Sequence, residues 1–178
     1  MKTRGLARTW AAPTAVAILL SAVAVGAALG YRHLVAAPSA GNSRSELALP
    51  RLDGDGSKRI SDFRGRPLVV NFFASWCPAC ITELPGFERA AHDYSGRIAF
   101  LGVNEQDDPA AGLKLAREAK LTYPLVRDTG DNRLFRLLHG AGMPTTVFLT
   151  SDGSVRLTYS GELSEELLRQ RLNDLAGK

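Results

Sequence analysis

The sequence predicts an α/β domain built on a mixed β-sheet, with a hydrophobic segment before it. Two continuous apolar runs, residues 67–74 and 97–104, have the composition of central strands that are buried on both faces. A helical pattern follows each run, and strands that alternate with helices are typical of an α/β sheet. Residues 145–150 and 154–159 indicate a final antiparallel hairpin, which makes the sheet mixed.

Shorter segments complete the domain, which we expect to span residues 44–178. An N-terminal β-hairpin is predicted at residues 46–50 and 58–60, around the turn sequence Asp-Gly-Asp-Gly. A short strand is expected at residues 123–126, and helices are expected at residues 78–95, 109–120, 132–139 and 164–176. Ser164 begins the last helix as its N-cap, and two glutamates follow in the first turn.

The net charge of +4 comes from the N-terminal segment and not from the domain. Four of the 22 basic side chains and none of the 18 acidic ones lie in residues 1–32, which leaves 18 of each sign in the rest of the chain. Because a domain with balanced charge lacks the basic excess that phosphate backbones attract, we expect no nucleic acid partner.

Residues 11–30 contain no charged side chain and predict a transmembrane helix. Twenty residues of helix span about 30 Å, the thickness of the hydrocarbon core of a bilayer. Trp10 and Tyr31 flank the run, where aromatic side chains favour the membrane interfaces. We therefore expect a signal-anchor at residues 10–31 and, because basic side chains precede it, a cytoplasmic segment at residues 1–9.

This arrangement places the domain outside the cytoplasm, held at the cell membrane by a single span. Residues 32–43, rich in Ala, Ser and Gly, are expected to form a flexible tether. A cleaved signal peptide is the alternative, since small-residue sites occur at residues 22–24 and 35–37. Removal of residues 1 to about 37 would give a secreted protein.

The two cysteines of the chain, Cys77 and Cys80, lie where the first buried strand ends and a helix begins. A pair so close in sequence closes too short a loop to stabilise the fold, so it indicates redox chemistry. The helix N-terminus favours a thiolate at Cys77, and the spacing puts both side chains on one helical face, within reach of a disulfide. Pro78 suits the first helical turn, and Pro78 and Ala79 together tune the reduction potential.

Three other uses of a cysteine pair fit the sequence less well. A structural zinc site needs four nitrogen or sulfur ligands, and His33, His92 and His139 are scattered. A copper site of the Sco type uses a wider cysteine spacing with a distal histidine. Peroxiredoxins carry a threonine three residues before the reactive cysteine, where this chain has Ala74. We therefore expect no metal, and no cofactor besides the Cys77–Cys80 disulfide.

Residues 44–178 resemble the TlpA/ResA/CcmG branch of thioredoxin-like proteins. The matching motifs occur in the family's order: Asn71-Phe72-Phe73-Ala74-Ser75-Trp76-Cys77-Pro78-Ala79-Cys80, Glu83 with Pro85, Gly102-Val103-Asn104, Tyr123-Pro124 and Gly142-Met143-Pro144-Thr145-Thr146. The resemblance implies a thioredoxin-like fold, with a mixed central sheet flanked by helices, and a thiol–disulfide oxidoreductase that uses the CxxC pair. Pro85 matches the proline at which the family's helix is kinked.

The resemblance also implies how substrate is bound. Pro144 matches the family's cis-proline, whose loop lies beside the disulfide, and Met143 before it offers backbone groups to an extended substrate strand. Trp76 is interpreted as an exposed platform for a peptide partner. His139 stands where the family has a small residue, and Gly140 where it often has an apolar one. We interpret His139 as a surface residue that ends a helix, with a thiolate-stabilising position as the alternative.

Glu83 follows Cys80 by one helical turn, on the face that points beneath the disulfide. In ResA-like proteins a glutamate at this position lies near the sulfurs and handles protons during exchange. Thioredoxins use a buried aspartate on the preceding strand instead, where this chain has Asn71. We therefore predict that Glu83 is partly buried, has a raised pKa and accepts a proton from Cys80. A solvated surface glutamate is the alternative.

The function that these features predict is the reduction or isomerisation of disulfides in exported proteins, with apocytochrome c as the substrate that the resemblance favours. The expected electron donor or acceptor is a membrane protein that itself exchanges thiols and disulfides. The direction of electron flow stays open at this point. One alternative is a thiol oxidase of exported proteins, and another is a redox-sensing or copper-binding module without turnover.

Overall fold

The computed structural model describes residues 44–128 and 130–177 of the chain. The predicted cytoplasmic segment at residues 1–9, the anchor at residues 10–31 and the tether at residues 32–43 lie outside the described residues. Within the two described ranges, no helix has both the length and the apolar character needed to cross a bilayer.

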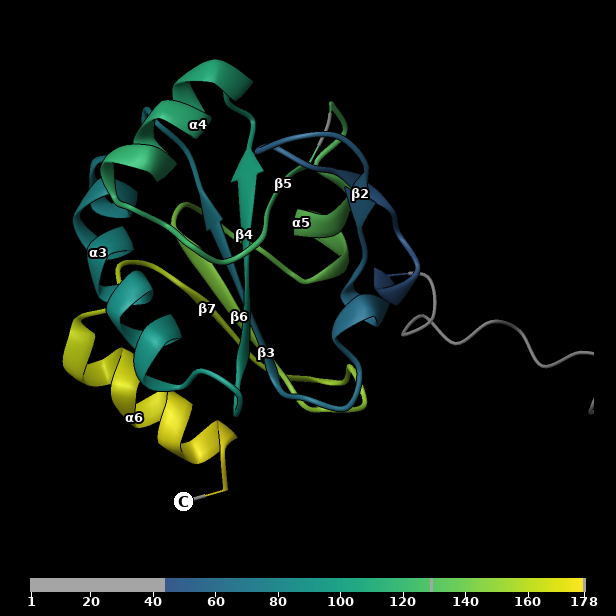
Figure 1. Ribbon diagram of the computed structural model, residues 1–178, viewed down its shortest axis with the longest axis vertical. Helices are drawn as coiled ribbons and strands as arrows, with labels where there is room; N and C mark the ends of the chain where they lie inside the picture. Colours follow the sequence, from purple (N-terminus) through teal and green to yellow (C-terminus); the bar gives the residue numbers. More distant parts are fainter. Residues whose placement is uncertain (1–43, 129, 178) are drawn as a thin grey trace, which may run out of the picture. The chain divides into compact units, whose positions relative to one another are not determined.

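A five-stranded sheet forms the centre of the domain, in the order β5–β4–β3–β6–β7 (Figure 1). Its strands are β3 (Leu68–Phe73), β4 (Ala99–Glu105), β5 (Leu125–Asp128), β6 (Thr145–Leu149) and β7 (Val155–Ser160). β4 pairs in parallel with both β3 and β5, whereas β6 pairs antiparallel with β3 and β7. The prediction of a mixed sheet that ends in a hairpin is therefore confirmed.

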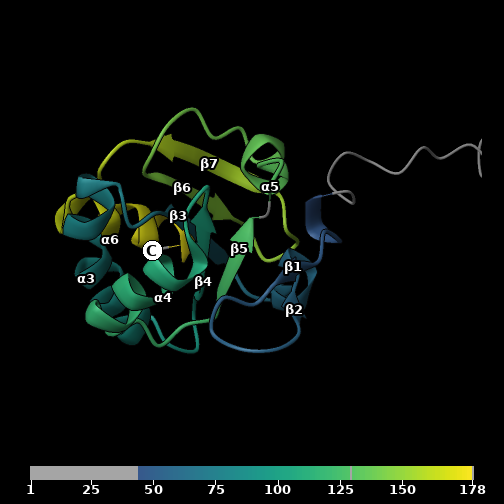
Figure 2. The ribbon, with the colours of Figure 1, turned by 90° about the horizontal axis from the view of Figure 1, so that it is seen from above.

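Four helices cover the two faces of this sheet: α3 (Pro78–Asp93), α4 (Pro109–Glu118), α5 (Arg133–Leu137) and α6 (Glu165–Leu175). Figure 2 shows α3, α4 and α6 on one face, with α5 and the N-terminal hairpin on the other. Side chains of β3 alternate between the two cores: Val69 and Phe73 join the core beneath α3, whereas Val70 and Phe72 join the core beneath α5. Burial on both faces explains the continuous apolar run in the sequence.

The N-terminal hairpin is shorter than predicted, with β1 at Leu49–Pro50 and β2 at Ser57–Lys58. Ile60, predicted to lie in the second strand of the hairpin, instead begins a 3₁₀-helix, η1 (Ile60–Phe63). A side chain in η1 can turn inward where an edge strand would leave it exposed, and Ile60 is buried against the core beneath α5.

Most other elements begin or end one or two residues from their predicted bounds, and two of these shifts have a local cause. The strand predicted at residues 123–126 begins at Leu125, because Pro124 has no N–H to donate to a ladder. The helix predicted at residues 132–139 ends at Leu137, since His139 adopts a left-handed backbone with φ of 60°. As predicted, Ser164 caps α6, because its hydroxyl accepts a hydrogen bond from the N–H of Leu167 at 3.2 Å.

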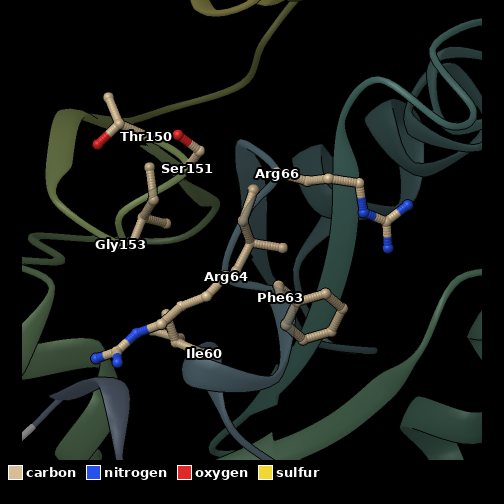
Figure 3. Close-up of a pocket in the computed structure, with 9 residues that line it drawn as sticks. Ile60, Phe63, Arg64, Arg66, Thr150, Ser151 and Gly153 are labelled. Atoms are coloured by element: carbon tan, nitrogen blue, oxygen red, sulfur yellow. The ribbon is translucent and has the colours of Figure 1, made fainter.

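A shallow pocket lies where β3 begins and β6 ends, between η1 and the β6–β7 turn (Figure 3). The N–H of Gly65 donates to the carbonyl of Ser151 at 2.8 Å and joins the two sides. In Figure 3 the guanidinium groups of Arg64 and Arg66 point away from each other. Because the cysteines follow the other end of β3, this pocket is not part of their surroundings.

Candidate active site

The redox pair lies at the N-terminus of α3, just after the carboxyl end of β3. Cys77 is the N-cap of α3, and Pro78 occupies the first helical turn, as the sequence predicts. The N–H of Cys80 donates to the Cys77 sulfur at 3.2 Å. The two cysteines form a disulfide with their Cα atoms 5.2 Å apart. An N–H group of the first turn therefore points at the sulfur that we expect to become the thiolate.

The two cysteines differ slightly in their exposure to solvent. Cys80 is fully buried, whereas Cys77 keeps 4% of its surface exposed. Ala79 between them is half-buried, and Pro78 is exposed. Both cysteines are therefore buried in the disulfide form, and Cys77 is the one that retains some solvent exposure.

Trp76 presents its indole to solvent next to the redox pair. Its residue surface is 55% exposed, as predicted, and its Nε1–H donates to the carbonyl oxygen of Gln106 at 2.9 Å. Ile81, which follows Cys80 in sequence, is 45% exposed. Within the described ranges these two are the exposed large apolar side chains, so the apolar surface available to a partner flanks the disulfide.

Glu83 is buried one turn after Cys80, in agreement with the prediction. Its Oε1 accepts a hydrogen bond from Nδ2 of Asn71 at 2.8 Å, and its Oε2 accepts one from the N–H of Leu163 at 3.1 Å. Burial raises the pKa of Glu83 from 4.5 to about 7, against the lowering effect of these two hydrogen bonds. The carboxyl group is therefore able to take up and release a proton near neutral pH.

The Met143–Pro144 peptide bond is cis, as predicted. The strand register pairs Thr145 with Phe72, so Pro144 lies one step further along, beside the end of β3 from which the chain continues to Cys77. Pro144 is buried, and its carbonyl accepts a hydrogen bond from the N–H of Gly161 at 2.8 Å. Met143 is half-buried against both cores.

His139 is an exposed residue that ends α5, which agrees with our first interpretation of it. The structure also explains the glycine that follows. A Cβ atom on Gly140 would lie 2.4 Å from the ring of Phe135, far inside van der Waals contact. The apolar residue that the family often carries here is therefore excluded by the position of the Phe135 ring.

Asp107 is a residue of the site that the sequence analysis missed. It lies in the loop between β4 and α4, at the same end of the sheet as the cysteines because β3 and β4 are parallel (Figure 1). Its carboxylate accepts hydrogen bonds from the N–H and the hydroxyl of Ser75 and from Nδ2 of Asn104, all within 2.8 Å. The sequence feature that could have indicated Asp107 is an acidic residue soon after the second buried apolar run, residues 97–104.

Glu105 and Asp128 form a buried carboxyl pair that the sequence did not indicate. They lie directly opposite each other on β4 and β5, and they are 3% and 5% exposed. Burial first, and the neighbouring Asp128 second, raise the pKa of Glu105 to about 7. Burial also raises the pKa of Asp128, whose Oδ2 accepts a hydrogen bond from the N–H of Phe135 in α5 at 2.8 Å. Glu105 therefore binds a proton more readily than an exposed glutamate does.

Comparison with known proteins agrees with this geometry. Residues 40–158 match the AhpC/TSA family. The thiol:disulfide interchange protein DsbE of Pseudomonas fluorescens biotype C is 35% identical over 125 residues, which cover 70% of this chain and 68% of that protein. The thiol-disulfide oxidoreductase ResA of Geobacillus thermodenitrificans is 29% identical over 157 residues, which cover 84% and 88%.

Among solved structures, the similarity extends to a secreted disulfide oxidoreductase of Mycobacterium tuberculosis. The two structures superpose with a TM-score of 0.68 at 22% identity, over 75% of this chain and 99% of that one, which shows a common fold. A thioredoxin-like fold, a CxxC disulfide at a helix N-terminus and these sequence matches lead to one assignment. The chain belongs to the AhpC/TSA family and is a thioredoxin-like thiol–disulfide oxidoreductase, homologous to DsbE and ResA, with Cys77 and Cys80 as its CxxC pair.

Proposed function

We propose that this protein reduces or isomerises disulfides in exported proteins, outside the cytoplasm and tethered to the membrane by residues 10–31. Apocytochrome c is the leading substrate, by resemblance to the TlpA/ResA/CcmG branch. The proposal rests mainly on Glu83, buried one turn after Cys80 and hydrogen-bonded to Asn71. A carboxylate one helical turn after Cys80 would oppose ionisation of the thiols, which makes the reduced form less stable and the protein more reducing.

The reaction begins with attack of the Cys77 thiolate on a sulfur of the substrate disulfide. A bond forms between Cys77 and that sulfur, and the second substrate sulfur leaves with the electron pair. Glu83 accepts the proton of Cys80, whose thiolate then attacks Cys77 and releases the first substrate sulfur. The substrate gains two electrons and becomes a dithiol, while Cys77 and Cys80 become a disulfide. Return to the dithiol requires a thiol–disulfide electron donor in the membrane.

Trp76, Met143 and Pro144 are proposed to hold the substrate during these steps. The indole of Trp76, just before Cys77 in sequence, and the side chain of Ile81, just after Cys80, offer exposed apolar surface. A peptide segment with apolar residues next to its cysteine would bury this surface.

The reduction potential is the measurement that tests the direction of electron flow. We expect equilibration with glutathione to give a value nearer to that of thioredoxin, about −270 mV, than to that of DsbA, about −120 mV. A value near that of DsbA would select a thiol oxidase. Tight copper binding, without turnover of insulin or a peptide disulfide, would select a binding module.

Substitution of each cysteine tests the order of attack. Cys77→Ser should abolish exchange, whereas Cys80→Ser should accumulate mixed disulfides with substrate, because the resolving thiol is absent. If Cys77→Ser traps the substrate instead, the two roles are reversed.

Membrane attachment is tested by fractionating cells that express a tagged full-length chain. We expect it in the membrane fraction, with an intact N-terminus by mass spectrometry. Recovery of a soluble form that begins near residue 38 would show cleavage instead.

A further inference from the structure

A pocket of about 210 Å³ lies between α3 and the segment that leads into α6. Thr82, Glu83, Gly86 and Arg89 of α3 form one wall, and residues 162–165 with Leu168 form the other. Liquid water occupies about 30 Å³ per molecule, so several molecules fit. The residues that line the pocket do not include Trp76, the cysteines or Pro144, so a substrate seated on that surface would leave it open.

Glu83 lies at the inner end of this pocket. Its two carboxyl oxygens are held by Asn71 of β3 and by the N–H of Leu163. The other charged groups at the pocket are Glu162 and an ion pair at 2.7 Å between Arg89 and Glu165, which joins α3 to α6. Glu162 adds to the effect of burial in raising the pKa of Glu83. Burial likewise raises the pKa of the Tyr123 hydroxyl, and Glu88 and Glu83 add to that effect.

Gly86 keeps the wall of the pocket free of a side chain. It is buried within α3, where glycine destabilises a helix relative to alanine. A Cβ atom there would meet nothing nearer than Nη2 of Arg89 at 3.9 Å and Cβ of Glu165 at 4.0 Å. Steric conflict therefore does not require glycine at this position, and the effect of its absent side chain is to leave the space beside Glu83 unfilled.

We propose that the α3–α6 pocket is the path by which Glu83 exchanges its proton with water while a substrate covers Cys77. This proposal rests on the reductase function proposed above. It adds a route for the proton that is separate from the surface that binds substrate. When Cys80 resolves the mixed disulfide, its proton passes to Glu83, the Cys77–Cys80 bond forms and the bond from Cys77 to the substrate breaks. The substrate leaves with the electron pair and takes a proton from solvent. Glu83 must be ionised to accept the Cys80 proton, so while the substrate still covers Cys77 it first releases any proton it holds to water in the pocket.

Side chains of increasing size at Gly86 test this route. Quenched-flow single turnover with a peptide disulfide, using acid to trap intermediates, separates attack from resolution. We expect resolution to slow from Gly86→Ala to Gly86→Leu, and Gly86→Leu to lose at least about fivefold. This is less than the roughly 10²–10⁴-fold that a proton acceptor contributes, because Glu83 itself remains. Attack, measured in the Cys80→Ser background, should keep its rate. His92→Leu adds the same side chain at an exposed position of α3 and serves as the control.

A double-mutant cycle distinguishes a blocked proton route from a distorted site. If the pocket serves Glu83, then Gly86→Leu should slow resolution no further once Glu83→Gln is present. Additive losses in the double variant, or an unchanged rate in Gly86→Leu alone, would overturn the proposal.

A second variant keeps the test valid if Gly86→Leu does not fold. Thr82→Leu narrows the pocket from the exposed end of the same wall and should give the same selective loss. If neither folded variant slows resolution while wild type reduces peptide disulfides, the pocket is not the route. If wild type itself reduces no disulfide, the reductase function fails, and the two failures are distinct.

Discussion

Asp107 binds Ser75 with both carboxylate oxygens: Oδ2 accepts the backbone N–H at 2.7 Å and Oδ1 accepts the hydroxyl at 2.6 Å. The loop after β4 thereby holds the loop that carries the redox pair, two residues before Cys77. The carbonyl of Gln106 adds a third link when it accepts the indole N–H of Trp76. The position of the exposed indole is therefore set by a segment some thirty residues further along the chain.

We predict that Asp107→Ala frees this loop. Loss of a partly buried carboxylate with several partners should lower the free energy of unfolding by about 1–3 kcal/mol and shift the indole N–H signal of Trp76 in NMR spectra. Asp108→Ala is the control: it removes the N-cap of α4, at a cost of about 1 kcal/mol, and should leave the Trp76 signal in place. A Trp76 signal unchanged in Asp107→Ala would contradict this account.

Glu83→Gln should remove an ionisation from the pH–rate profile of exchange. The carboxylate forms as pH rises through about 7, so the single-turnover rate of wild type should rise there. In the variant, loss of the proton acceptor should slow exchange about tenfold or more near neutral pH, although the thiols ionise more readily without a negative neighbour. Thiol titration should show lower thiol pKa values in the variant, and turnover measurements should show a slower rate. Exposed Glu118→Gln should change neither, and a Glu83→Gln profile that matches wild type would leave Glu83 without a role.

The Glu105–Asp128 pair should make stability depend on pH. The pKa of Glu105 is higher in the folded protein, at about 7, than its ordinary 4.5, so the folded state binds the proton more tightly. The stabilisation that comes from the proton on Glu105 is complete below about pH 4.5 and is lost as pH rises to about 7. Over this range the loss lowers the free energy of unfolding by at most about 1.4 kcal/mol per pH unit. Arg136, which faces the pair, lowers the pKa of Glu105 and weakens the effect.

Urea denaturation of Glu105→Gln at several pH values between about 4.5 and 8 measures this contribution. We expect a shallower decline in the free energy of unfolding than in wild type, with the remaining slope due in part to Glu83, whose pKa is also about 7. Glu166→Gln changes an exposed glutamate of α6 and should keep the wild-type slope. An unaltered slope in Glu105→Gln would show that the pair does not hold a proton.

Gly140→Ala should destabilise the domain, because its Cβ atom would lie 2.4 Å from the Phe135 ring. Phe135 cannot move freely, since it stacks edge-on against Phe72 of β3 with ring centres 5.2 Å apart. Overpacking of this kind costs about 1–3 kcal/mol. Gly142→Ala, two residues along, meets nothing within 4 Å and should have little effect on the thermal midpoint. Equal midpoints for the two variants would contradict the close approach.

The sequence predicts the centre of the fold better than its edges. β3 and β4 were recognisable because both of their faces are buried, which gives continuous apolar runs. The redox pair and Glu83 share one helix, so their relation follows from helical spacing alone. The contact of Asp107 with Ser75 was not predictable, because it depends on how the β4–α4 loop turns, with Gln106 at φ of 45°. The pairing of Glu105 with Asp128 depends on the register of two strands, which no local pattern specifies.

Asn71 has one further consequence for the proton that Glu83 carries. Its Nδ2 donates to the Glu83 carboxylate, while its Oδ1 is buried with no hydrogen-bond partner among the described residues. An amide holds a donor and an acceptor on one carbon, so a half-turn of the group lets Oδ1 receive the O–H of a protonated Glu83. The hydrogen bond can thus persist through both halves of a turnover. An aspartate at this position would be a second group that binds and releases a proton. With Asn71 there, Glu83 is the one partner of this contact that changes its protonation state.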